Sequence, residues 1–168
     1  MATYVLIHGA GDVGWYWHLV KAELRERRHD VVAPDLPCDE DSAGLPEYAD
    51  AVIEAIGDRT DLVVVAQSLG AFTAPLVCHR VPVDLLVLVA PMIPMPNEAP
   101  ADYWTNTRYE EEVHDHYDDE IALFYQDVPP AGCPGAEART ETVGGKIVRA
   151  LPARIMARRA HAGPALSR

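Results

Sequence analysis

The chain is poor in cysteine, in basic side chains and in long apolar runs. Its three cysteines, Cys38, Cys78 and Cys133, lie far apart and in no metal-ligand spacing, so we expect neither a disulfide framework nor a metal site. No apolar run reaches the roughly 18 residues that a membrane-spanning helix needs, and residues 1–3 carry no charged export signal. These absences predict a cytoplasmic protein that does not associate with membranes.

Basic residues are outnumbered: 14 Lys and Arg face 26 Asp and Glu, which gives a formal net charge of -12 at pH 7. Such a charge repels nucleic acid phosphates and anionic membrane surfaces, and it offers no steering toward acidic substrates. A length of 168 residues, of which 49% are hydrophobic, is suited to a single packed domain. The composition therefore favours a small neutral or apolar ligand and excludes a nucleic acid partner.

The charge changes sign along the chain. Residues 1–130 hold 24 acidic and 7 basic side chains, whereas residues 131–168 hold 2 acidic and 7 basic ones. The second segment also contains 9 Ala, 6 Arg and 5 Gly, without a sustained apolar period. We interpret residues 1–130 as a folded core and residues 131–168 as an atypical tail, which a shifted reading frame or a truncated gene product would explain.

Four short runs of β-forming apolar residues alternate with segments of helical spacing. The predicted strands are 4–7, 31–33, 62–66 and 85–89, and the predicted helices are 15–28, 45–56 and 69–79. Strands that alternate with helices are typical of α/β proteins with a parallel sheet. Four prolines between residues 91 and 100 interrupt regular structure, and the acidic, aromatic-bearing segment after them predicts a helical lid over residues 91–127.

The sequence Ala66-Gln67-Ser68-Leu69-Gly70 lies between the third predicted strand and the third predicted helix. A sharp strand-to-helix turn of this kind lifts a serine hydroxyl clear of the sheet, and small neighbours let the backbone bend. The alternative is that Ser68 only caps the helix that follows it. His8-Gly9 at the end of the first strand favours the catalytic interpretation, because acyl transfer needs backbone N–H donors beside the nucleophile.

These motifs resemble those of the α/β-hydrolase family, especially its plant methyl-esterase and hydroxynitrile-lyase branch and bacterial relatives. The resemblance spans residues 3–130 and is carried by His8-Gly9-Ala10, Gly14-Trp15, Trp17 and the segment 66–70. It implies a parallel-sheet α/β-hydrolase fold in which Ser68 is the nucleophile and the N–H groups of Ala10 and Leu69 form the oxyanion hole. It also implies that no cofactor is needed. We expect Trp15 either to pack the first helix against the sheet and lid or to line the substrate pocket.

In this family a histidine, oriented by an acid, activates the serine, and both residues follow the serine in the chain. The two strands that would carry them are not recognisable, so we expect the C-terminal strands to be incomplete or missing. His161 is the only late histidine and therefore the candidate base, whereas no triad acid is identified. Missing strands would leave an apolar sheet edge, which predicts a homo-oligomer.

The resemblance implies hydrolysis of a small carboxylic ester through an acyl-enzyme on Ser68. Without a recognisable base, we expect this chain to be weakly active or inactive. One alternative is an inactive relative that binds a small ligand.

Another alternative is a dinucleotide-binding domain, since Gly9, Gly11 and Gly14 fit G-x-G-x-x-G and Asp35 follows the next strand. The bulky residues 15–17 count against it. We instead expect His8 to support the oxyanion turn, Asp35 to be a turn residue and Trp17 to pack in the core.

Overall fold

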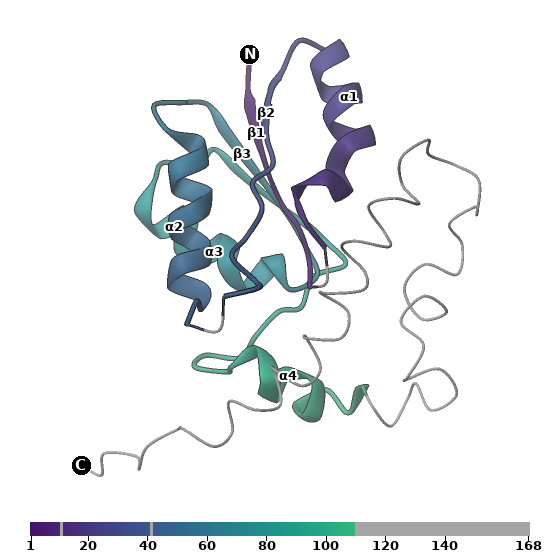
Figure 1. Cartoon of the computed structure of the whole chain (residues 1–168), viewed down its shortest axis with the longest axis vertical. Coiled ribbons are helices and arrows are strands. Elements are labelled where there is room, and N and C mark those ends of the chain that lie inside the picture. Colours follow the sequence, from purple (N-terminus) through teal and green to yellow (C-terminus); the bar gives the residue numbers. More distant parts are fainter. Residues whose placement is uncertain (11, 41, 110–168) are drawn as a thin grey trace. The chain divides into compact units, whose positions relative to one another are not determined.

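The computed structural model describes residues 1–10, 12–40 and 42–109 (Figure 1). The chain divides into two compact units, Met1–Met95 and Pro96–Arg168. The predicted boundary at residue 130, the tail after it and residues 110–127 of the predicted lid lie outside the described residues. In the second unit, the structure describes helix α4 (Pro100–Asn106). This helix begins at a proline because the first helical position needs no N–H donor.

The first unit is built on a sheet of four parallel strands. These are β1 (Thr3–Ile7), β2 (Asp30–Val32), β3 (Leu62–Gln67) and β4 (Leu85–Val89), in the order β2-β1-β3-β4. Residue 7 pairs with residue 66, and residue 67 pairs with residue 89, so the carboxyl ends of β1, β3 and β4 meet at one edge. The prediction of a parallel α/β sheet is confirmed.

Helices cover both faces of this sheet (Figure 1). Helices α2 (Leu45–Ile56) and α3 (Gly70–Arg80) pack on one face, and α1 (His18–Glu26) lies on the other. The first predicted helix differs from expectation, because Gly14–Trp17 forms a separate 3-10 turn, η1, before α1 begins. Among the described residues, no helix is long and apolar enough to cross a membrane.

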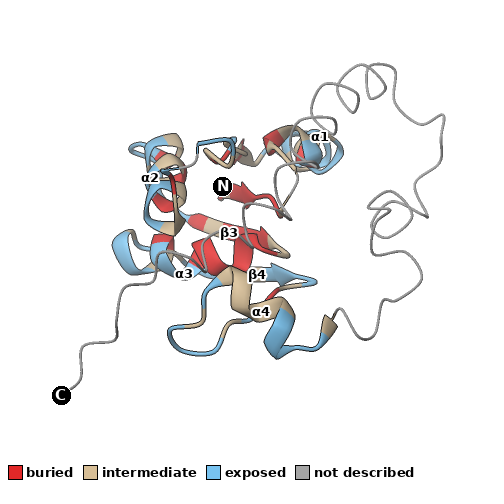
Figure 2. Ribbon diagram, turned by 60° about the horizontal axis from the view of Figure 1, so that its bottom comes forward, coloured by how far each residue is buried: buried red, intermediate tan, exposed pale blue. Residues whose placement is uncertain are grey.

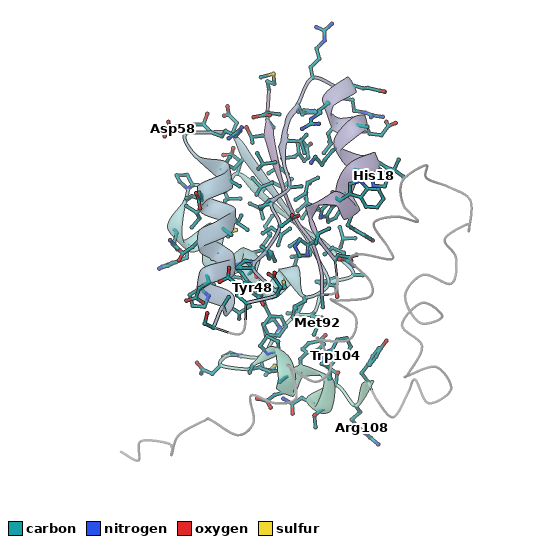
Figure 3. All side chains as sticks on the ribbon, in the orientation of Figure 1. His18, Tyr48, Asp58, Met92, Trp104 and Arg108 are labelled. Atoms are coloured by element: carbon teal, nitrogen blue, oxygen red, sulfur yellow. The ribbon has the colours of Figure 1, made fainter. Side chains whose placement is uncertain are left out.

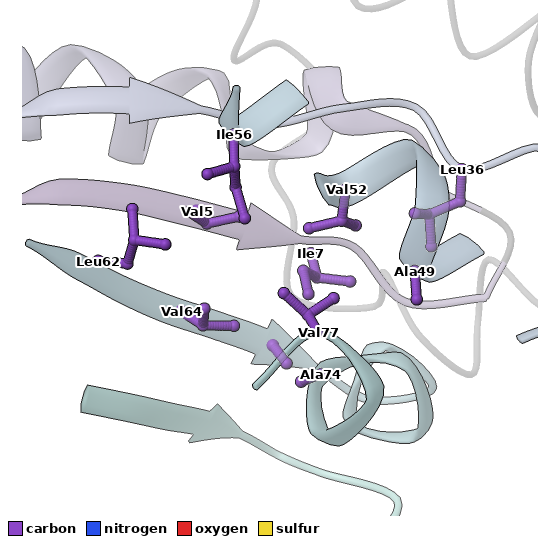
Figure 4. Packing of buried hydrophobic residues seen from close by; sticks show 11 residues of the cluster. Val5, Ile7, Leu36, Ala49, Val52, Ile56, Leu62, Val64, Ala74 and Val77 are labelled. Atoms are coloured by element: carbon purple, nitrogen blue, oxygen red, sulfur yellow. The ribbon is translucent and has the colours of Figure 1, made fainter. Parts of the chain in front are cut away.

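The core consists of two apolar layers, one on each face of the sheet. Alternation along β1 sends Val5 and Ile7 into the layer beneath α2 and α3, and Leu6 into the opposite layer. Figure 4 shows the first layer, in which Val52 of α2 and Val77 of α3 meet the strand residues. Because both faces are covered, these strands are continuous apolar runs in the sequence.

Strand β4 forms an apolar edge of the described sheet. It pairs with β3 on one side, and no described strand pairs with its other side. Leu85 is 54% exposed and Leu88 is 41% exposed, which makes the strand largely pale blue in Figure 2. An edge of this kind matches the expectation of incomplete C-terminal strands for the part of the chain that the structure describes.

Candidate active site

The loops after β1 and β3 lie side by side at the centre of the sheet, where the chain connections lead outward in opposite directions. From β1 the chain crosses to β2 on one side, and from β3 it continues to β4 on the other. In open α/β sheets, ligands bind outside the carboxyl ends of the strands at such a point. His8 and Gly9 follow β1, and Ser68 follows β3, so both sequence motifs meet there.

Ser68 occupies a sharp turn between β3 and α3. Its φ angle of 50° places it in the left-handed region, which costs a non-glycine residue about 1–3 kcal/mol and persists only where surrounding interactions offset that cost. The Ser68 N–H donates to the carbonyl of Val89 at 3.1 Å, and the Ser68 carbonyl accepts from the N–H of Met92, also at 3.1 Å. The end of β4 therefore holds the strained turn, and Met92 is labelled there in Figure 3.

The hydroxyl of Ser68 does not cap α3. The cap residue is Leu69, and no side chain makes a cap hydrogen bond at this helix. Within the described part of the chain, no donor or acceptor pairs with the Ser68 hydroxyl, and no hydrogen bond engages the N–H groups of Ala10 and Leu69. This arrangement favours the nucleophile over the helix-cap alternative, while the oxyanion-hole assignment of Ala10 and Leu69 stays a prediction.

Two glycines let the turn after β1 approach the serine turn closely. A β-carbon at position 70 would lie 2.8 Å from the carbonyl oxygen of His8 and 3.0 Å from that of Ile7. A β-carbon at position 9 would lie 3.0 Å from the β-carbon of Ser68. A real β-carbon almost never lies within 3.0 Å of another atom, so position 70 requires glycine, whereas a β-carbon at position 9 would force neighbouring side-chain atoms to shift.

His8 is completely buried and serves as a support for the turn, as expected. Its Nδ1 donates to the carbonyl of Gly9 at 2.8 Å, and its Nε2 accepts from the N–H of Leu36 at 3.1 Å. These partners require the neutral ring with the proton on Nδ1. Burial lowers the pKa of His8, against opposing contributions from the Gly9 carbonyl and Asp35. Both nitrogens are occupied, so His8 is unsuited to act as the catalytic base.

Asp35 also has a structural role. Its Oδ1 accepts a hydrogen bond from the N–H of Gly14 at 2.8 Å, across 21 residues of sequence. A β-carbon at position 14 would collide with the carbonyl oxygen of Ala33. The carboxylate and the glycine that the dinucleotide-binding alternative requires are therefore used to pack the start of η1 against the loop after β2.

Trp15 and Trp17 have different environments. Trp17 is 6% exposed and belongs to the apolar layer beneath α1, as predicted. Trp15 is partly buried, and its ring stacks on that of His18 with centroids 4.0 Å apart and planes inclined by 11°. His18 is labelled at the start of α1 in Figure 3. The role of Trp15 in substrate binding stays a prediction.

His161, the predicted base, lies outside the described residues. In residues 1–10, 12–40 and 42–109, no cluster of His, Cys, Asp and Glu has the arrangement of a metal site. The structure thus brings together Ser68, Leu69 and the loop that carries Ala10, and it does not test their partnership with His161.

Comparison with known families gives a match to the alpha/beta hydrolase family over residues 4–167. Among curated proteins, methylesterase 9 of Arabidopsis thaliana is 33% identical over 99 residues, which cover 53% of this chain and 39% of that protein. Norfluorocurarine synthase 2 of Strychnos nux-vomica is 29% identical over 119 residues, which cover 64% of this chain and 44% of that protein. The chain spans less than half the length of these two relatives.

Solved structures show the same fold. A pyrethroid hydrolase from Sphingobium faniae superposes with a TM-score of 0.65 at 19% identity, covering 81% of this chain and 65% of the hydrolase. An extracellular alpha/beta-hydrolase from a Paenibacillus species gives a TM-score of 0.58 at 22% identity, covering 67% and 50% of the two chains.

Proposed function

Because the chain belongs to the α/β-hydrolase family, we propose that it is a hydrolase that cleaves small carboxylic esters through an acyl-enzyme on Ser68. The observation that carries this proposal is the left-handed turn of Ser68, held at the carboxyl end of the sheet beside Gly9. A strained serine whose hydroxyl no described residue engages is costly to maintain, and a role as nucleophile would explain why it is kept. Similarity to proteins named methylesterases supports an ester as the substrate.

The proposed reaction has two acyl-transfer steps. The Ser68 hydroxyl attacks the ester carbonyl while a base accepts its proton, and the same proton passes to the alcohol as the carbon–oxygen bond breaks. Water then attacks the acyl-enzyme by the same route, which releases the acid and restores the serine. The negative oxygen formed in each step would accept hydrogen bonds from the N–H groups of Ala10 and Leu69, and one such donor contributes about 10²–10³ to kcat.

We propose His161 as the base, since the histidine comes last in the family's order of catalytic residues, and since His8 has both ring nitrogens engaged in the turn. The other histidines of the described segments, at positions 18, 29 and 79, make no hydrogen bond to Ser68. Every step is a proton or acyl transfer, so the proposal includes no cofactor.

A neutral substrate suits the protein better than an acidic one, given its net charge of -12. We therefore propose short-chain neutral esters, beginning with methyl esters, and assign Trp15 to the pocket that receives them. The indole of Trp15 is partly buried and stacks on the ring of His18, and its remaining apolar surface would suit a neutral ester.

A second candidate is an inactive relative that binds a small ligand at the same place. The observation that favours it is that no described residue supplies a base to Ser68. In that case the oxyanion donors would hold a carbonyl oxygen without turnover.

Intact-protein mass spectrometry after treatment with a fluorophosphonate distinguishes the two candidates. We expect a single adduct on the wild-type chain, no adduct on Ser68→Ala and a much slower reaction for His161→Asn. A folded chain that gives no adduct would overturn the hydrolase proposal and support the ligand-binding one. An adduct that forms equally fast with His161→Asn would remove His161 from the mechanism and leave Ser68 as the nucleophile.

A further inference from the structure

Gln67 is the last residue of β3 and immediately precedes the candidate nucleophile. Its side-chain oxygen, Oε1, is buried and accepts no hydrogen bond from the described part of the chain. A buried acceptor without a donor costs free energy, so its presence beside a functional turn requires a physical explanation. Most other residues of β3 are apolar, and an apolar side chain at position 67 would avoid that cost.

The side-chain amide of Gln67 lies next to the α-carbon of Gly9. A β-carbon at position 9 would collide with Oε1 of Gln67 and would lie 3.2 Å from its Cδ. The space that a side chain at position 9 would need is therefore already filled by the amide of Gln67 and by the β-carbon of Ser68. The Gln67 side chain fits in its observed position because residue 9 has no side chain, so we treat Gln67 and Gly9 as a pair.

This pair connects the two halves of the candidate site. Gly9 directly precedes Ala10, whose N–H is a proposed oxyanion donor, and Gln67 directly precedes Ser68. The His8 ring in turn accepts a hydrogen bond from the N–H of Leu36. The turn after β1 is thus in contact with the imidazole of His8, through the Gly9 carbonyl, and with the side-chain amide of Gln67.

We infer that Gln67 is a positioning residue, whose amide packs against Gly9 and sets the distance between the turn that carries Ala10 and the nucleophile. Its effect on rate rests on the proposed hydrolase function. Its effect on the folded structure does not, because the contact with Gly9 exists without substrate. Misplacing a catalytic group by about 1 Å can cost about 10²-fold in rate.

The test is a double-mutant cycle of Gly9→Ala, Gln67→Ala and the double variant, measured by the rate of fluorophosphonate labelling and by the midpoint of thermal unfolding. Gly9→Ala should label at least tenfold more slowly and unfold at a lower temperature, because its methyl group displaces the amide. Gln67→Ala should lower kcat for an ester with little change in KM, because the oxyanion donor moves while the substrate pocket stays. The double variant should recover part of both losses of Gly9→Ala, since the shortened side chain frees space for the methyl group.

The matched control pairs Gly9→Ala with Val63→Ala, which shortens another side chain on the same face of β3, four residues from Gln67. This control should show no recovery. Effects of Gly9→Ala and Gln67→Ala that simply multiply, with no recovery in the double variant, would overturn the inference. If Gly9→Ala does not fold, recovery of folding in the double variant takes the place of the rate.

Failure of the two proposals can be told apart. If even the wild-type chain is not labelled, the hydrolase proposal fails, and the unfolding midpoints alone decide whether Gln67 and Gly9 are coupled. If the wild-type chain is labelled but the cycle shows no coupling, the hydrolase proposal stands and the positioning role of Gln67 fails.

Discussion

Replacing Gly70 by alanine should destabilise the protein, although alanine is the better helix former. Gly70 is the first residue of α3 and has no left-handed φ, so an unhindered methyl group would stabilise the chain by about 0.4–1 kcal/mol. Here the new β-carbon would lie 2.8 Å from the carbonyl oxygen of His8, 3.0 Å from that of Ile7 and 3.1 Å from Cγ2 of Ile7. Two of these three atoms are backbone carbonyl oxygens, one of the last residue of β1 and one of the residue that follows it, and a backbone atom cannot shift as easily as a side chain.

Overpacking of this kind costs about 1–3 kcal/mol, and the rigid backbone places Gly70→Ala near the upper end of that range. After the helix-propensity gain is subtracted, we expect a net loss of about 2 kcal/mol in the free energy of unfolding. Urea denaturation measures this loss as a lower transition midpoint at an unchanged slope. The sign of the change in unfolding free energy is the test. A Gly70→Ala variant as stable as the wild type, or more stable, would refute the close approach between α3 and the end of β1.

Two further predictions concern pH and association. Burial lowers the folded-state pKa of His8 below its ordinary value of 6.5, so the unfolded chain takes up the proton at a higher pH than the folded chain does. The free energy of unfolding should therefore fall as the pH drops below about 6.5, by at most about 1.4 kcal/mol per pH unit. Unfolding midpoints between pH 5 and 8 should show a weaker slope for His8→Gln than for the control His79→Gln at an exposed position, and equal slopes would contradict the buried neutral ring. The apolar edge at β4 should make the chain self-associate, and Leu86→Lys with Leu88→Lys should reduce this. A sharp monomer peak of the wild-type chain in size-exclusion chromatography would count against it.

The strands and the elbow were predictable because their signals are local. The runs at 62–66 and 85–89 are apolar and rich in Val and Leu, and the structure places β3 and β4 there with bounds that agree within one residue. The sharp turn at Ser68 was also predictable, since it lies between such a strand and a helix with a small neighbour at position 70, whereas the role of Ser68 as nucleophile stays a prediction. The supporting role of His8 in the turn was expected from the family resemblance, and its two hydrogen bonds to Gly9 and Leu36 confirm it.

The features that depend on contacts between distant residues were not predictable. The first helix was expected from residue 15, but the N–H of Gly14 is held by Asp35, 21 residues away, and a 3-10 turn forms at that point. The strand order β2-β1-β3-β4 and the contact of Gln67 with Gly9 depend on which strands become neighbours. The only sequence signal for this contact is a glycine after His8, and glycine there also fits a plain turn.

The hydrogen bonds that hold the conformation of Ser68 do not involve the proposed base, His161. The partners that hold the Ser68 turn are the carbonyl of Val89 and the N–H groups of Ala71 and Met92, all within the compact unit Met1–Met95. The strain of the turn is thus balanced by hydrogen bonds that do not involve His161. Replacing His161 should therefore slow proton transfer from Ser68 while the unit keeps its unfolding midpoint, whereas replacing Gly70 should lower both the midpoint and the labelling rate. If His161 is the base, its loss would leave the strained turn of Ser68 in place, so labelling rate and stability must be measured on the same variants.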